Sequence, residues 1–126
     1  MKYLLPSWMV LPLVLLTLWP GLAFGQDLTG TYALYQKGKE SKGVVGYMRI
    51  TSQRGNRFSI GNASPTGNPA YDWTGQGTLQ GNSGSYTWRF EDGKTGKTTF
   101  TVDNAGNLHG QVWGSGVNWG YIARKQ

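Results

Sequence analysis

Alternation of apolar and polar residues is the dominant pattern in this chain, and it is clearest over residues 85–91. There the even-numbered positions are all aromatic and the odd-numbered positions are all polar, which is the period of a β-strand with one buried face. A turn-forming stretch at 92–96 follows, and the alternation resumes over 97–103, which predicts a hairpin. Two further segments, 107–112 and 117–124, each follow a glycine-containing turn and extend the hairpin into a four-stranded meander.

The first half of the domain predicts four more strands, at 28–36, 44–52, 57–62 and 71–80. A polar loop separates the first two of these strands. The segment between the last two contains two prolines and is predicted to be a loop, because proline cannot donate a hydrogen bond to a sheet ladder. No window of eleven or more residues after position 25 shows the apolar stripe of a helix. The sequence therefore predicts an all-β domain of about eight antiparallel strands in up-and-down order. A single closed barrel suits such strands because closure removes unpaired edges.

The first 25 residues differ from the rest of the chain. Lys2 supplies a positive charge, an apolar stretch runs to Trp19, and Ala23 and Gly25 are the small residues that a signal peptidase reads. The apolar run is short and no stop-transfer pattern follows it, which predicts a signal peptide over 1–25 and no transmembrane anchor. The opening residues resemble a bacterial periplasmic leader. We therefore expect a periplasmic or secreted protein with one β-barrel domain over 26–126.

Aromatic residues compensate for a small number of aliphatic ones. The chain has six Trp and seven Tyr, and a buried ring removes roughly 150–250 Å² of surface from water, so a folded aromatic core is expected. The chain also has 20 Gly. At the inward-facing strand positions Gly30, Gly46 and Gly110, we expect the missing side chain to let a ring lie over the backbone or to leave room for a ligand.

The sequence offers few groups for catalysis or for holding a cofactor or metal. It has no Cys, which excludes disulfides, thiolate metal sites and a cysteine nucleophile. His109, the one histidine, falls on the polar face of its predicted strand, and a single imidazole makes no transition-metal site without carboxylates. Asp72 is the one acidic residue that is a candidate for a site, and even there a turn or strand-edge role is the preferred interpretation. We predict a binding protein without enzyme activity, metal or cofactor.

Positive charge is spread over the predicted loops. Lysine and arginine number 12 against six acidic residues, for a formal net charge of +6. This charge favours contact with anionic envelope material through long-range attraction, and the export signal argues against nucleic acid as a partner. Three aromatic residues are expected at exposed or rim positions beside these charges. The predicted surface-interaction residues are Tyr71, Trp73, Trp113, Lys37, Lys39 and Arg57.

The two ends of the domain resemble the calycins, the barrel superfamily that contains lipocalins, fatty-acid-binding proteins and avidins. The calycin signature is Gly-x-Trp on the first strand, with a basic residue of the last strand packed over that ring. The matching residues here are Gly30, Tyr32 and Arg124, with Tyr in place of Trp. Segments 28–32 and 73–76 also resemble short avidin segments. The resemblance implies a closed eight-stranded barrel with a binding site inside, near one mouth.

Two functions follow from these features. The preferred one is an exported, non-enzymatic barrel that binds a small apolar or aromatic ligand in its interior or mouth. The alternative is an envelope interaction protein with a filled core, which binds a glycan, an anionic polymer or a protein such as a hydrolase through exposed Trp and basic loops. A hollow barrel would favour the first, because barrels of this size hold either side chains or one small ligand. The predicted wall residues are Tyr32, Tyr47, Trp88, Trp119 and Tyr121.

Overall fold

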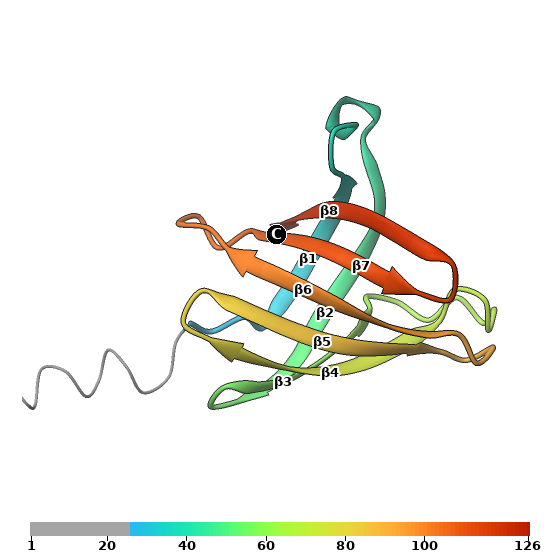
Figure 1. The fold of residues 1–126 in the computed structure, drawn as a ribbon, viewed down its shortest axis with the longest axis horizontal. Helices are drawn as coiled ribbons and strands as arrows, with labels where there is room; N and C mark the ends of the chain where they lie inside the picture. Colours follow the sequence, from blue (N-terminus) through green and yellow to red (C-terminus); the bar gives the residue numbers. More distant parts are fainter. Residues whose placement is uncertain (1–25) are drawn as a thin grey trace, which may run out of the picture.

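Residues 26–126, the part of the chain that the computed structural model describes, form eight antiparallel strands that close into a barrel. Each strand pairs with the next one, and β1 pairs with β8 to close the sheet. The strands are β1 (Gly30–Gln36), β2 (Val44–Arg54), β3 (Arg57–Asn62), β4 (Trp73–Gln80), β5 (Ser83–Phe90), β6 (Thr95–Val102), β7 (Leu108–Gly114) and β8 (Val117–Lys125), with a 3₁₀ turn η1 (Glu40–Lys42) between β1 and β2. In Figure 1 the yellow-to-red strands run across the view, and β1 and β2 cross behind them at a steep angle. The predicted all-β barrel is confirmed, whereas the predicted signal peptide lies outside the described residues.

The predicted strand boundaries differ from the observed ones where local hydrogen bonds set the ends. The turn after β5 is shorter than expected, because the Phe90 N–H donates to the Lys94 carbonyl over 2.8 Å and lets β6 begin at Thr95. The fourth strand begins at Trp73 and not at Tyr71, since both residues before Trp73 donate to the Asn68 carbonyl in a turn.

The connections between strands divide the barrel into two different ends. The turns after β2, β4 and β6 lie at one end, which we call the closed end, and the remaining loops lie at the other, the open end. Segment 26–29 covers the closed end with the buried side chain of Leu28. The Leu28 N–H donates to Gln53 Oε1 over 2.7 Å, and its carbonyl accepts the Tyr32 hydroxyl over 2.6 Å. Gln53 Nε2 also donates to the Gln26 carbonyl over 2.7 Å, so these residues are part of the barrel.

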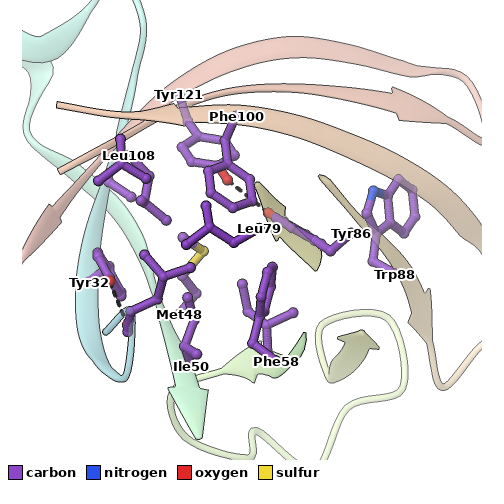
Figure 2. Packing of buried hydrophobic residues seen from close by; sticks show 14 of the residues in the cluster. Tyr32, Met48, Ile50, Phe58, Leu79, Tyr86, Trp88, Phe100, Leu108 and Tyr121 are labelled. Atoms are coloured by element: carbon purple, nitrogen blue, oxygen red, sulfur yellow. Dashed lines mark hydrogen bonds between the residues drawn. The ribbon is translucent and has the colours of Figure 1, made fainter. Parts of the chain in front are cut away.

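Apolar side chains on the inner face of the sheet form one continuous core (Figure 2). Rings pack edge to face in it: the Phe58 centroid lies 6.3 Å from Tyr86 and 5.9 Å from Phe100. Trp88 lies at the edge of this cluster, beyond Tyr86. The core therefore fills the barrel from the closed end towards the middle. Its buried members are Leu28, Tyr32, Met48, Ile50, Phe58, Ile60, Leu79, Tyr86, Trp88, Phe100, Val102, Leu108, Val112, Tyr121 and Ala123.

Several inward-facing glycines lie directly under aromatic rings, and Gly110 and Gly96 are two of them. A Cβ atom at Gly110 would overlap the Tyr121 ring, and one at Gly96 would overlap the Trp88 ring and the Trp113 carbonyl oxygen. At Gly46 a Cβ would meet only Leu34 Cδ1, at 3.9 Å. The expectation for Gly110 is confirmed, because only glycine lets the ring lie against the backbone there.

Replacing Gly96 with alanine is expected to lower the free energy of unfolding by about 1–3 kcal/mol, as overpacking of a well-filled interior does. The added methyl must displace the Trp88 ring or the neighbouring strand. Gly46→Ala is the matched control, and its effect should stay within about 0.5 kcal/mol because its Cβ has room. Urea unfolding followed by circular dichroism measures both variants, and equal stabilities would contradict the close approach at Gly96.

Candidate functional site

An apolar cavity of about 180 Å³ lies inside the barrel towards the open end. The alternation over 85–91 explains why it is aromatic, because every even-numbered residue of β5 from Tyr86 to Phe90 faces inward. None of its lining residues is Asp, Glu, Lys, Arg or His. The cavity therefore suits an uncharged guest. Its walls are Leu34, Met48, Trp73, Tyr86, Trp88, Phe90, Thr98, Val112, Val117, Trp119 and Tyr121.

The polar atoms of these walls fall into two groups. The hydroxyls of Tyr86 and Tyr121 form a buried hydrogen bond of 2.8 Å with each other (Figure 2). Burial raises the pKa of Tyr86 and raises that of Tyr121 further, because the ionised form of each would lack water. Both phenols are therefore neutral at physiological pH. In contrast, Trp88 Nε1 and Thr98 Oγ1 are buried and have no hydrogen-bond partner among residues 26–126.

Three of the predicted wall residues line the cavity, and two do not. Trp88, Trp119 and Tyr121 lie on its wall, and their role in binding stays a prediction. Tyr32 is fully buried but lies deeper, at the closed end, where burial and the nearby charge of Asp27 raise its pKa to about 12. The predicted wall position of Tyr32 is therefore wrong.

The predicted wall position of Tyr47 is also wrong. The even-numbered residues Met48 and Ile50 of β2 face inward, so Tyr47 faces outward and its side chain is 50% exposed. Met48, which the sequence analysis did not select, takes the inner position and lines the cavity. The two expectations for this strand required opposite phases, and the structure has the one that places Gly46 inward, beside Leu34.

Trp73 lies at the rim, which is one of the two positions expected for it. It lines both the cavity and the groove at the mouth, is partly exposed and also packs against the core. Its ring stacks on Tyr86 with a centroid distance of 6.1 Å and an interplanar angle of 15°, and it contacts Phe90 at 6.2 Å. The Trp73 N–H donates to Asn62 Oδ1 over 2.9 Å. This backbone bond joins the start of β4 to the end of β3, and the indole of Trp73 lines the cavity.

An open groove adjoins the cavity at the mouth of the barrel, and we call it the rim groove. Its outer part includes three exposed apolar residues, Val45, Tyr47 and Tyr71, of which Tyr71 is 64% exposed as expected. Four residues line both the groove and the cavity, so one apolar surface leads from the outside to the inside. These shared residues are Leu34, Trp73, Phe90 and Trp119.

Asp72 holds the loop that carries this rim. Its side chain is buried and accepts bonds from the Thr66 N–H (2.7 Å), the Thr66 hydroxyl (2.7 Å) and the Gly67 N–H (3.0 Å), and a fourth from Asn62 Nδ2 (3.0 Å). The bonds from Thr66 are the main cause of its lowered pKa. With its oxygens occupied in this way, Asp72 has the turn role that its sequence context favoured over a site.

The predicted basic residues do not form one surface. Lys37 and Lys39 are exposed in the loop after β1 at the open end, whereas Arg57 is exposed at the start of β3 at the closed end. Trp113 is 42% exposed on the outer face of β7, as expected. His109 also faces outward, and its Nε2 lies 2.9 Å from Asp103 Oδ2.

The basic residue over Tyr32 is not the one expected. Arg124 lies over the ring of Tyr35, with Cζ 4.9 Å from the centroid, while Lys125 Nζ lies 5.9 Å from the Tyr32 centroid. The reason is the register, which pairs Lys125 with Tyr32 and Arg124 with Ala33, so that Lys125 shares the side of the sheet with Tyr32. The role predicted for Arg124 therefore belongs to Lys125. Gly30 precedes them at the start of β1, where a Cβ would lie 3.1 Å from Lys125 Cε.

Within the described part of the chain, no helix is long and apolar enough to cross a bilayer. The same residues bring together no group of three or more His, Cys, Asp or Glu side chains that would suit a metal ion. Comparison of the chain with protein-family models, with curated proteins and with solved structures gave no match. The chemistry of the site therefore rests on the cavity and its rim.

Proposed function

We propose that the chain is an exported, non-enzymatic binding protein that holds a small apolar or aromatic ligand in the cavity at its open end. The observation that carries this proposal is the uncharged cavity of about 180 Å³ at one end of the buried core. Protein interiors are close-packed, and an empty cavity lowers stability. A cavity of this size at the mouth of a barrel is therefore better explained by a guest than by packing.

The volume of the cavity limits the guest to about one substituted ring. An apolar cavity of roughly 150 Å³ in another protein admits benzene, and this one is slightly larger. The resemblance to the calycins supports the same site, because those barrels bind ligands inside and near one mouth. The predicted signal peptide supports a periplasmic or secreted location.

The proposal is tested by blocking the cavity. Wild-type protein should bind toluene saturably, with a Kd on the order of 0.1–1 mM. The corresponding binding free energy per non-hydrogen atom lies below the ceiling known for very small ligands. Val117→Phe, which places a ring in the cavity, should weaken binding at least about tenfold. Val44→Phe is the matched control, since Val44 is exposed and is not among the cavity's lining residues. Isothermal titration calorimetry measures all three proteins, and equal binding by Val117→Phe would contradict the site.

The rim groove favours a second candidate function, contact with a larger envelope molecule. Tyr47, Tyr71 and Val45 expose apolar surface there, and exposed rings stack on sugars or on a partner protein. Native mass spectrometry of protein purified from the compartment to which it is exported separates the two candidates. A retained small molecule supports the cavity, whereas a bound glycan or protein supports the groove.

A further inference from the structure

Positive charge reaches the rim groove at one position. Among the described residues that line the groove, Arg49 is the single charged one, and no Asp or Glu is present. The cavity that adjoins the groove has no charged lining residue. A guest that occupies both spaces therefore meets an uncharged interior at one end and an unopposed positive charge at the other.

The guanidinium of Arg49 is available to a ligand. The side chain is exposed, and its Nε donates to Thr31 Oγ1, which also belongs to the groove, over 3.0 Å. Neither of the two ion pairs within residues 26–126 includes Arg49, so no carboxylate of this part of the chain neutralises it. A guanidinium carries several N–H donors in a planar fork that matches an oxyanion. The bond to Thr31 uses one of these donors and holds the side chain beside the groove.

Loop residues that share the groove with Arg49 use their polar groups on one another. Asn62 Nδ2 donates to the Ser64 carbonyl over 2.7 Å and to Asp72 Oδ1 over 3.0 Å. The Thr66 hydroxyl donates to the same Asp72 oxygen over 2.7 Å. These side chains hold the loop, whereas Arg49 has both the charge and the donors to bind an anion.

Strand β2 places Arg49 within reach of the mouth of the cavity. Arg49 and Tyr47 both face outward, and Gly46 pairs with Leu34, which lines the groove and the cavity. At about 3.3 Å per residue, Arg49 lies about 10 Å along the strand from Gly46. Tyr47 lies between them in the sequence and exposes its ring to the groove. A ring in the cavity and an anionic group at Arg49 can therefore belong to one molecule with a short flexible linker.

We infer that the ligand is a small anionic amphiphile, which places an apolar ring in the cavity and an oxyanion, such as a carboxylate, at Arg49 in the rim groove. This inference rests on the proposed function, because it names the ligand class of the same cavity. The charged group stays beside an exposed side chain and gains a counter-ion, so no unpaired charge is buried. A hydrogen bond between a guanidinium and an oxyanion is charge-assisted and stronger than a neutral one.

Phenylbutyrate and its amide test the inference, because they have nearly the same shape and differ in charge at neutral pH. In low-salt buffer, wild-type protein is expected to bind phenylbutyrate at least about fivefold more tightly than phenylbutyramide, since only the carboxylate forms a charge-assisted bond with Arg49. The preference should shrink in about 1 M sodium chloride, which screens exposed charges. Isothermal titration calorimetry measures both affinities.

Three variants locate the effect. Arg49→Gln removes the charge at an exposed position and should reduce the preference to less than about twofold. Arg54→Gln removes the same charge at the closed end of the same strand, outside the lining of the groove and the cavity, and should keep the wild-type preference. Val117→Phe fills the cavity and should weaken phenylbutyrate binding at least about fivefold, because the phenyl ring then has no place.

The other outcomes separate this inference from the proposed function. A carboxylate preference that survives in Arg49→Gln, or that falls as much in Arg54→Gln, reflects the net charge of the protein and overturns the assignment of Arg49. Undiminished phenylbutyrate binding by Val117→Phe would show that the ligand does not use the cavity, which also overturns the inference. If wild-type protein binds toluene without any carboxylate preference, the inference fails while the proposed function stands. If it binds none of the three compounds, both fail together.

Discussion

Replacing Trp88 with alanine is expected to lower the free energy of unfolding by about 3–5 kcal/mol, as large truncations in a core do. The Trp88 ring is buried, lies over Gly96 and packs edge to face on Phe90 with a centroid distance of 5.6 Å. The variant loses this buried area and also enlarges the cavity. The surroundings cannot collapse to fill the space, because β5 and β6 are held by the closed ladder of the barrel.

Trp113→Ala provides the matched control for this result. Trp113 lies on the outer face of β7 beside Gly96, and much of its ring is already in water. Its removal should change the free energy of unfolding by less than about 1 kcal/mol. Urea unfolding followed by far-ultraviolet circular dichroism compares the two variants without depending on tryptophan emission. A loss below about 1 kcal/mol for Trp88→Ala would show that its ring does not contribute to the core.

Replacing Leu28 with alanine is expected to lower the free energy of unfolding by about 2–5 kcal/mol. Leu28 precedes the first strand, yet its side chain is almost completely buried in the core at the closed end. Its backbone bonds to Gln53 and Tyr32 do not involve the side chain and remain possible in the variant. The loss in the free energy of unfolding therefore measures what the leucine side chain itself contributes to the core at the closed end.

The control for Leu28→Ala is Val45→Ala, an aliphatic truncation on the outer face of β2. Val45 is largely exposed, so the change should stay within about 0.5 kcal/mol. Urea unfolding followed by tryptophan fluorescence suits this pair because neither variant alters a tryptophan. Similar small losses in both variants would mean that segment 26–29 is not an integral part of the fold.

The closed end and the open end have different roles in this interpretation. Leu28, Tyr32 and Gln53 join the segment before β1 to the barrel and complete its hydrogen bonds. The open end keeps the apolar cavity and the rim groove. The closed end is therefore sealed by its own residues, and the proposed chemistry lies at the other end.

Much of the barrel was predictable because strand alternation is a local property. Tyr86, Trp88 and Phe90 share one face in any extended chain, and polar residues between them leave a single choice for the buried face. In β2 the alternation does not show which face is buried, because neither face is polar over its first five residues. These residues are Val44, Val45, Gly46, Tyr47 and Met48. The phase of β2 is set by its pairing with β1 and β3, which includes irregular steps in both registers.

The sequence by itself determined the all-β class, the approximate positions of the strands, the aromatic core of β5 and the absence of cysteine chemistry. Only the tertiary structure decided that Tyr47 faces outward, that Trp73 stacks on Tyr86 at the rim, and that Lys125 and not Arg124 lies over Tyr32. It alone also revealed the cavity and its connection to the rim groove. The physical reason is that alternation depends on neighbours along the chain, whereas register, closure and empty space depend on residues brought together from every part of the domain.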